Sequence, residues 1–390
     1  MHPQPHGTEL ATNDLDRLIL LRRQLHRHPE LSGSEHRTAA AVAEFLAATR
    51  PDEIVTGLGG HGVAVAYSGA DTGPTLLLRA ELDALPITEV TEVSYRSEHD
   101  GVGHQCGHDG HMTVLAGVGL LLGRRRPTRG RVVLLFQPSE ENAVGAAAVL
   151  ADPAFERLHP DLALALHNLT SLPLGQVVLD EGVVNCASRG VRVILDGEPT
   201  HASAPEGGVS PATAIARLLT SLPALGRGTE IDSDYRLVTV THAALGERAF
   251  GVAPGHGEIW ATLRTMTDDG MDALRADAGH LAVDVAEQEG LRVTVEEADV
   301  FHHCENHPAA VTLLRRALDH EGVPHTTGVV ERGSEDFGRF RAVAPSAMFF
   351  IGSRRSADGP DLHHPDFDFP DQLIDTGTRV FARAVREFLD

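Results

Sequence analysis

Hydrophobic positions recur with two different periods in the end portions of this chain. Residues 14–27 are amphipathic, with leucine and isoleucine near helical spacing, which predicts a helix. Residues 74–79 are nearly all apolar, as is typical of a central strand buried on both faces. Further helices are predicted at 34–48, 111–125, 143–150, 307–321 and 370–389, and further strands at 62–68, 131–137, 161–167 and 347–351. Strands and helices in this alternating order predict a largely parallel α/β sheet.

The pattern changes near residue 176, beyond which apolar residues recur at alternating positions. Strands are predicted at 181–196, 235–244, 257–267 and 291–297, and helices at 210–224 and 267–289. This order of elements is the ferredoxin-like pattern, and it interrupts the α/β portion as an insert. We therefore predict a two-domain α/β protein: an α/β sandwich made of residues 1–180 and 297–390, and an inserted ferredoxin-like α+β domain at 181–296.

The composition agrees with this division and excludes some partners. A length of 390 residues favours two domains, and 42% hydrophobic with 23% charged residues is ordinary for a soluble globular protein. The formal net charge of −22 argues against nucleic acid or an anionic membrane surface as the main partner. The apolar runs are too short to span a membrane.

The cysteines indicate a reducing compartment. Cys106, Cys186 and Cys304 are too few, and odd in number, for a disulfide framework, so we expect all three to be reduced. Residues 1–13 are polar and have no apolar core, so they do not resemble a signal peptide. Both features predict a cytoplasmic protein.

The chemically most distinctive segment is 104–111, which holds a thiol, three imidazoles and a carboxylate. Such a cluster can lower the pKa of a thiol and deprotonate it onto a metal ion. Cys106 and His108 are separated by one glycine, which lets both side chains turn toward one ion. Alone, this run only suggests a metal site.

Further ligand-type residues follow the predicted strands. They are Glu81 and Asp83 after 74–79, Glu140 and Glu141 after 131–137, and His167 at the end of 161–167. In an open α/β sheet the carboxyl ends of the strands form the binding crevice. The recurrence of these residues at strand ends predicts a metal site assembled by folding, with His363 or His364 as a further candidate.

Motifs in a fixed order then extend over nearly the whole chain. They include His-Arg-His-Pro-Glu-Leu-Ser at 26–32, Cys-Gly-His-Asp-Gly-His at 106–111, Gln-Pro-Ser-Glu-Glu at 137–141 and Gly-Ser-Glu-Asp-Phe at 333–337. In these motifs the chain resembles the M20 peptidase family. Within that family it resembles the amidohydrolase branch, which includes hippurate hydrolases, N-acyl-amino-acid deacylases and auxin-conjugate hydrolases.

This resemblance implies two divalent metal ions held close together. The implied ligands are Cys106, shared between the ions, with His108, Glu141, His167 and His363. Zinc or manganese is expected first, and cobalt or nickel is compatible with the same ligands. His364 lies beside His363, and the sequence leaves open which of the two binds metal.

The resemblance also implies roles for four other residues. Glu140 would be the general base, and Asp83 would orient a metal ligand. In the insert, His201 would stabilise the oxyanion, reaching across a homodimer interface into the partner's site, and Arg264 would bind the substrate's α-carboxylate. The insert would thus be a lid and dimerisation domain, hinged near residues 180 and 297.

Three positions depart from the branch. Glu81 replaces an aspartate and is one methylene longer, which we expect to shift the geometry around the ligands. Gly251 lacks a side-chain amide that would help hold substrate, and Glu206 replaces a second histidine. An acidic residue beside the pocket would disfavour a substrate with an additional carboxylate.

These features together predict a metal-dependent amidohydrolase. It would cleave the amide bond of an N-acyl amino acid or a related small amide, with a metal-bound hydroxide attacking the acyl carbonyl. Three alternatives stay open: a carboxypeptidase or dipeptidase of the same broader family, a ureide or carbamoyl amidohydrolase, and a metal-binding relative without turnover.

Overall fold

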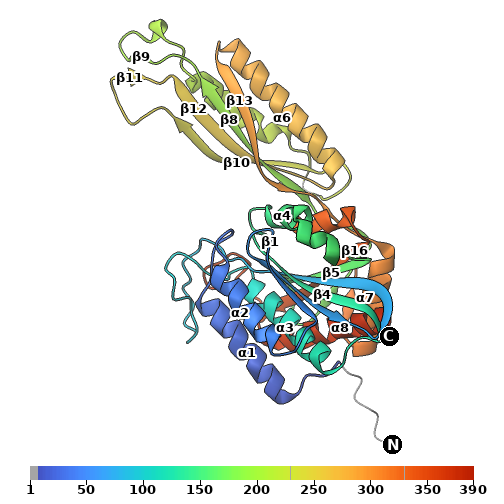
Figure 1. Cartoon of the computed structure of the whole chain (residues 1–390). Coiled ribbons are helices and arrows are strands. Elements are labelled where there is room, and N and C mark those ends of the chain that lie inside the picture. The colour runs from blue at the N-terminus through green and yellow to red at the C-terminus, as the bar shows by residue number, and fades with distance from the viewer. Residues whose placement is uncertain (1–7, 229, 329) are drawn as a thin grey trace, which may run out of the picture. The chain divides into compact units, whose positions relative to one another are not determined.

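The computed structural model describes residues 8–390 except 229 and 329 (Figure 1). The described chain divides into two compact units. The larger unit consists of the described residues of Met1–Val184, Glu305–Val329 and Asp336–Asp390, and the inserted unit of Asn185–Cys304 and Val330–Glu335. The inserted unit also contains the short segment Val330–Glu335, so the chain enters this unit twice. No pattern in the sequence indicates this second segment.

The larger unit is built on a mixed sheet in the order β1-β2-β4-β3-β5-β16-β6-β15. The four central strands, β4, β3, β5 and β16, are parallel, whereas β1, β2 and β6 form antiparallel pairs nearer the edges. The expectation of a parallel sheet therefore holds for its centre. The strands are β1 (Glu53–Leu58), β2 (Gly62–Ser68), β3 (Asp71–Glu81), β4 (Arg129–Gln137), β5 (Leu162–Pro173), β6 (Val177–Val178), β15 (His325–Thr326) and β16 (Ser346–Arg354).

The centre of the sheet is buried because its strands are apolar on both faces. Leu77 of β3 pairs with Val133 of β4 and Ala163 of β5, and all three side chains are fully buried. The strand β1 was not predicted from the sequence. It is an edge strand with partly exposed side chains, so it shows neither a continuous apolar run nor strict alternation.

Helices cover this sheet, and α3 is the most deeply buried of them. It packs against β3 and β4, and α1 and α8 pack against it (Figure 1). The helices are α1 (Thr12–Arg27), α2 (His36–Ala47), α3 (His108–Arg124), α4 (Gly145–Ala151), α7 (Pro308–Glu321) and α8 (Gln372–Leu389), with short 3₁₀ turns η1 (Pro153–Leu158) and η4 (Asp336–Ala342).

The helix α3 begins at His108, three residues before the predicted start. Gly107 has φ 101°, in the left-handed region that glycine adopts without strain, and this turn lets the helix begin at the next residue. His108 and Asp109 consequently lie in the first helical turn and not in the preceding loop. The prediction was wrong because the histidine-rich run hides the apolar period until residue 112.

The inserted unit has the predicted order of strands and helices. Its four-stranded antiparallel sheet has the order β10-β12-β8-β13, and α5 and α6 pack on one face over a core that includes Val193, Ile259 and Leu274. These elements are β8 (Ala187–Asp196), α5 (Ala212–Ser221), β10 (Arg236–Leu245), β12 (His256–Thr265), α6 (Asp268–Gln288) and β13 (Arg292–Phe301). Its shorter elements are β9 (Thr200–His201), η2 (Pro205–Gly207), η3 (Pro223–Leu225) and β11 (Val252–Ala253). The strands β7 (Gly182–Asn185) and β14 (Cys304–Asn306) pair with each other where the chain passes from one unit to the other.

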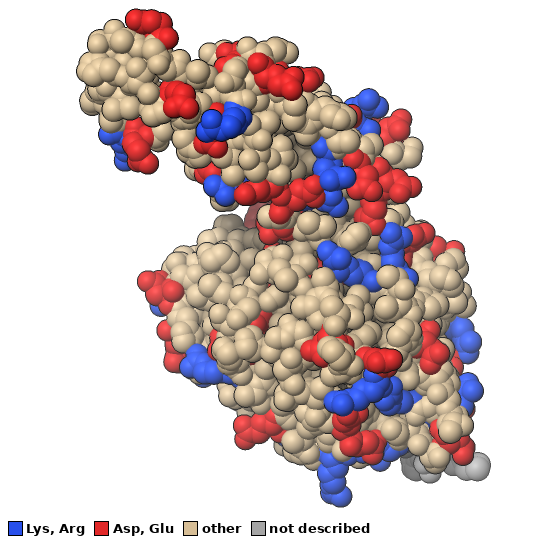
Figure 2. Space-filling view, turned by 45° about the horizontal axis from the view of Figure 1, so that its top comes forward, with Lys and Arg blue, Asp and Glu red and all other residues tan. Residues whose placement is uncertain are grey.

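Charged side chains of both signs are interspersed on the face shown in Figure 2, where the Arg side chains do not gather into one broad patch. None of the described helices is long and apolar enough to cross a membrane.

The close packing of α3 generates a stability prediction. A Cβ added to Gly117 would overlap the Thr378 hydroxyl on α8 and lie 3.2 Å from Leu18 Cδ1 on α1. Gly117→Ala is therefore expected to lower the free energy of unfolding by about 1–3 kcal/mol, because the methyl group overpacks a filled core. The matched control is Gly279→Ala in α6, where an added Cβ meets no atom within 4 Å. That substitution should raise stability by about 0.4–1 kcal/mol. Urea unfolding measures both, and a stabilised Gly117→Ala would contradict the close packing.

Candidate metal centre

The candidate ligands lie where the central strands of the larger unit reach their carboxyl ends. Glu81 ends β3 and Asp83 follows it, while Glu140 and Glu141 come shortly after β4. His167 lies inside β5 and not at its end, because β5 continues to Pro173 in pairing with β16. The loop before α3 supplies Cys106, and the first residue of α3 is His108, at the same edge of the sheet.

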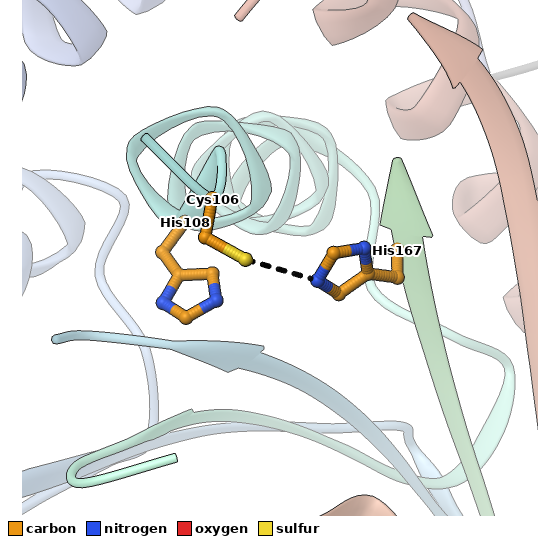
Figure 3. Close-up of side chains that lie close together, drawn as sticks. All are labelled: Cys106, His108 and His167. Carbon is orange, nitrogen blue, oxygen red and sulfur yellow. Dashed lines mark hydrogen bonds between the residues drawn. The ribbon is translucent and has the colours of Figure 1, made fainter. Parts of the chain in front are cut away.

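Five of the predicted ligands converge in two overlapping sets. In one set, ligand atoms of Cys106, His108 and His167 lie within 4.8 Å of one another. In the other, Cys106 is grouped in the same way with Glu141 and His363. Figure 3 shows the Cys106 thiol pointing toward the His167 ring, with Sγ 3.5 Å from Nε2. Since Cys106 belongs to both sets, the arrangement suits two cations that share one thiolate.

The hydrogen bonds of two histidines leave their other ring nitrogens facing this cluster. His108 Nδ1 donates to the Asp83 carbonyl at 2.8 Å, and His167 Nδ1 donates to the Asn168 carbonyl at 2.8 Å. His108 Nε2 is buried and has no hydrogen-bond partner among the described residues. A histidine whose Nδ1–H is bound to a carbonyl presents Nε2 as a lone pair, which is the usual preparation of a metal ligand. The residues therefore fit divalent cations.

The electrostatic environment also fits cations. Burial, together with the Glu141 and Glu140 carboxylates, raises the pKa of the Cys106 thiol well above its usual value. A divalent cation would reverse this effect, since thiolate binds metal and the carboxylates would be compensated. Burial and the nearby His111 lower the pKa of His167 to about 3, so its ring is neutral and able to bind metal at neutral pH.

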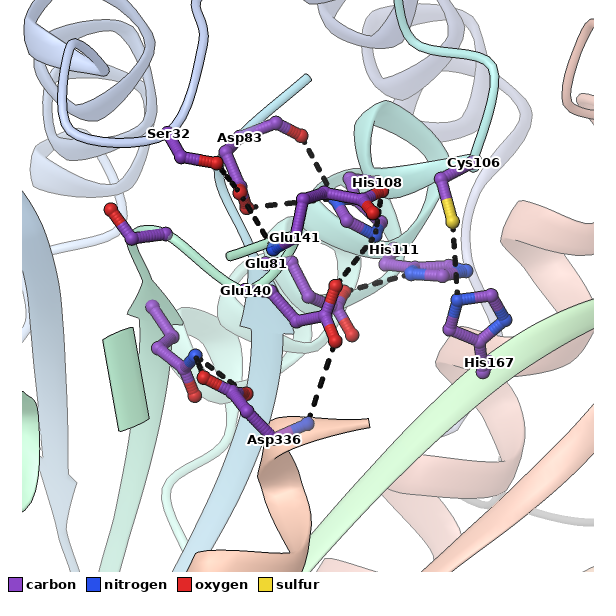
Figure 4. Close-up of polar contacts among 12 residues, drawn as sticks. Ser32, Glu81, Asp83, Cys106, His108, His111, Glu140, Glu141, His167 and Asp336 are labelled. Atoms are coloured by element: carbon purple, nitrogen blue, oxygen red, sulfur yellow. Dashed lines mark hydrogen bonds and ion pairs between the residues drawn. The ribbon is translucent and has the colours of Figure 1, made fainter. Parts of the chain in front are cut away.

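Glu140 lies beside the cluster in a buried position. Its Oε1 accepts a hydrogen bond of 3.4 Å from the Asp336 backbone, and its Oε2 is 4.0 Å from His108 Nε2 (Figure 4). The backbone around it is strained, with φ 53° at Ser139 and 62° at Ala143. Such strain persists only where neighbouring contacts hold the loop, and the Ser139 N–H donates to the buried Glu35 at 2.8 Å.

Asp83 organises the cluster through both its backbone and its side chain. Its carbonyl accepts a hydrogen bond from His108 Nδ1, while its Oδ2 accepts hydrogen bonds from Ser32 Oγ at 2.7 Å and from the Glu141 N–H at 3.0 Å. The carboxylate is farther from the histidine, with Oδ1 3.7 Å from His108 Nδ1. Asp83 thus contacts two of the candidate ligands at once.

Behind the ligands lies a buried series of hydrogen-bonded side chains that was not predicted from the sequence. His111 Nδ1 lies 2.8 Å from Glu81 Oε2, and its Nε2 lies 2.7 Å from Asn168 Oδ1. Although burial opposes ionisation, the Arg79 guanidinium and His111 hold the pKa of Glu81 well below its usual range. Glu81 was expected as a ligand-type residue at a strand end and as a longer replacement for aspartate, but its pairing with His111 was not predicted. Its extra length is used to reach His111.

The two C-terminal histidines differ in their surroundings. His363 has φ 64°, and its Nε2 lies 3.8 Å from Glu141 Oε1. His364 Nδ1 instead accepts a hydrogen bond of 3.1 Å from the Asp366 N–H and is in neither ligand set. The geometry therefore favours His363.

Two predicted residues belong to the inserted unit and are described within it. Arg264 on β12 donates from Nη1 to the Arg332 carbonyl and to Ser334 Oγ, both at 2.9 Å. His201 in β9 is exposed, and its Nδ1 lies 2.7 Å from Ser203 Oγ. Both residues lie in a unit that contains none of the five ligand candidates.

Comparison with known proteins agrees with the motifs. The family model for peptidase family M20/M25/M40 matches residues 77–387. N-acetylcysteine deacetylase of Bacillus subtilis is 26% identical over 94% of this chain and 95% of its own length. N-acetyldiaminopimelate deacetylase of Geobacillus thermodenitrificans is 29% identical over 89% of this chain and 91% of its own.

A solved structure is similar over nearly the whole chain. It is the YXEP protein of Bacillus subtilis, described as a dinuclear metal binding peptidase from the M20 family. It has a TM-score of 0.81 and 25% sequence identity, and the match covers 97% of this chain and 99% of that protein. From the match over residues 77–387, this chain belongs to peptidase family M20/M25/M40 and is a metal-dependent hydrolase that acts on amide bonds.

Proposed function

We propose that this chain hydrolyses the amide bond of N-acyl amino acids or related small amides, releasing a carboxylic acid and a free amino acid. The observation that carries the proposal is the pair of ligand sets that share Cys106, with the buried Glu140 beside them. The names of the relatives, which are deacetylases of N-acetyl amino acids, support this class of substrate.

The proposed ligands of two divalent ions are Cys106, His108, Glu141, His167 and His363. Zinc or manganese is proposed first, with cobalt or nickel as alternatives that the same donor atoms accept. When bound, two such ions polarise the amide carbonyl and lower the pKa of the attacking water. The chain itself supplies the spacing, since Asp83 holds His108 and Glu141 together.

Glu140 moves the proton in this proposal. Its carboxylate takes a proton from the attacking water as the new C–O bond forms, and delivers it to the amide nitrogen as the C–N bond breaks. The leaving amine thereby departs neutral and the acid product carries the second oxygen. The burial of Glu140, at 5% exposure, supports this role because few water molecules compete for the proton.

The inserted unit is proposed to recognise the substrate. Arg264 would bind the α-carboxylate, for which a planar guanidinium is well suited. His201 would donate to the developing oxyanion from the partner subunit of a homodimer, a contribution of about 2.7–4 kcal/mol in other enzymes. We also propose that the unit closes over the substrate as a lid. We propose that the enzyme works in the cytoplasm, in keeping with its three buried cysteines, which form no disulfide with one another.

Two departures from the branch bear on the choice of substrate. Gly251 is exposed, and an added Cβ there would meet no atom within 4 Å, so the position has room for the amide that is missing. Glu206 is exposed in η2. We propose that this carboxylate disfavours acyl amino acids with a second acidic group and favours neutral or cationic ones.

The first test is metal-dependent turnover. Metal-depleted protein should release no amino acid from acetyl, benzoyl or indole-acetyl amino acids, and restoring zinc, manganese, cobalt or nickel should restore release. The matching amino acid amides, which lack the α-carboxylate, should be cleaved poorly because Arg264 has no anion to bind. Release of ammonia and carbon dioxide from carbamoyl compounds, without cleavage of acyl amino acids, would replace this proposal with the ureide alternative.

A pair of isosteric variants separates the base from its neighbour. Glu140→Gln should lower kcat by about 10²–10⁴-fold while the protein still binds two metal ions, because only the proton acceptor is lost. Glu141→Gln should instead lose metal, because a ligand is removed. Kinetics and elemental analysis of both proteins measure these effects. Loss of metal from Glu140→Gln alone would contradict the proposed roles.

Mixing two inactive variants tests the proposed homodimer. When equal amounts of His201→Ala and Glu140→Gln chains exchange subunits, about one quarter of all sites should combine an intact Glu140 with the partner subunit's His201. Activity should recover to that level. Verified mixed dimers without any recovery would show that His201 does not serve the partner's site.

A further inference from the structure

Two charged side chains of α1 contact two of the segments that carry candidate metal ligands, the start of α3 and the loop that contains His363. Arg22 and His26 lie one helical turn apart and are each 0% exposed. Burying a guanidinium or imidazolium lowers the stability of the fold unless the charge is paired. The partners of Arg22 and His26 therefore fix where these side chains lie.

The first segment carries Cys106 in the loop before α3 and His108 at the start of α3. His26 Nδ1 lies 2.9 Å from Asp109 Oδ2, and Arg22 Nε lies 3.5 Å from the same oxygen. Asp109 directly follows His108 in the first turn of α3. On its other side, His26 Nε2 lies 3.0 Å from Glu89 Oε1, so carboxylates on both edges fix the orientation of the ring.

The second loop is the one that carries His363. Arg22 donates to Asp368 Oδ1 from both terminal nitrogens, at 2.7 and 2.6 Å, and its Nε is 3.3 Å from Asp371 Oδ1. Tyr95 covers the guanidinium at 4.6 Å and also donates to Asp368 at 3.1 Å. Arg22 thus joins a residue next to one candidate ligand to a residue five positions after another.

We infer that Arg22 and His26 are positioning residues, which set the spacing between the Cys106–His108 loop and the His363 loop. This inference rests on the proposed metal centre. Neither side chain belongs to a ligand set, so neither would touch the reacting atoms. A site assembled from separate loops binds ions tightly only when the loops are held at the right distance beforehand, and second partners of this kind tune metal affinity.

The same two helices offer a matched control at their other ends. Asp14 of α1 binds Arg124 of α3 through two hydrogen bonds of 2.5 Å. Both pairs join α1 to α3, but Asp14 lies at the beginning of α1 and Arg124 at the end of α3, away from the ligand loop. A variant at Asp14 therefore weakens the packing of the same helices without touching the ligand loops.

The experiment compares His26→Gln with Asp14→Asn in the full chain. Thermal unfolding of the metal-free proteins measures stability, and competition with a zinc chelator measures zinc affinity. Both variants should lower the melting temperature, but only His26→Gln should weaken zinc binding, by about 10–100-fold. Unchanged zinc affinity in folded His26→Gln, or equal losses in the two variants, would overturn the inference.

A second variant covers the case in which His26→Gln does not fold. Asp368→Asn keeps the shape of the side chain at the second loop and removes the charge that Arg22 binds. The same loss of zinc affinity is expected. Normal zinc affinity in this variant would overturn the inference. The test is independent of turnover. A protein that binds two zinc ions and cleaves no amide would overturn the proposed function, whereas normal zinc affinity in the variants would overturn only the positioning role.

Discussion

The structure of the larger unit depends on compensating the negative charge buried at the carboxyl ends of its central strands. Glu81, Asp83 and Asp336 are each 0% exposed, and Glu140 is only slightly accessible. A buried carboxylate is stable only with cations or hydrogen-bond donors around it. Arg79 supplies a cation to both Glu81 and Asp336, and backbone N–H groups serve Asp83 and Glu140.

The remaining negative charge explains why this edge of the sheet suits divalent metal. Burial and two glutamates raise the pKa of Cys106, so its thiol stays protonated in the protein alone. A bound cation would favour the thiolate. The strained backbone at Ser139, Ala143 and His363 lies on the loops that carry these groups. Strain of this kind is held in place by the surrounding hydrogen bonds, so the ligand geometry and the charge network support each other.

The chemical groups are divided between the two units. The five proposed ligands and Glu140 belong to the larger unit, whereas Arg264 and His201 belong to the inserted unit, which has its own core around Val193 and Ile259. The proposed metal ligands therefore lie in the same unit as the charge network that surrounds them. In the proposed function Arg264 and His201 recognise the substrate, so substitutions in the inserted unit would change substrate preference without altering the ligands.

The sequence by itself determined the central strands, the ferredoxin-like insert and the identity of the ligand-type residues. Strand β2 has the bounds predicted for it, because continuous apolar runs reflect burial on both faces. The tertiary structure decided the partners: Glu81 with His111, His26 with Asp109, and His363 close to Cys106 and Glu141. A residue type fixes which bonds a side chain can make. Which bond it makes depends on the segments that meet at the end of the sheet, where buried charges such as His26 and Asp109 find their partners across a long separation in the chain.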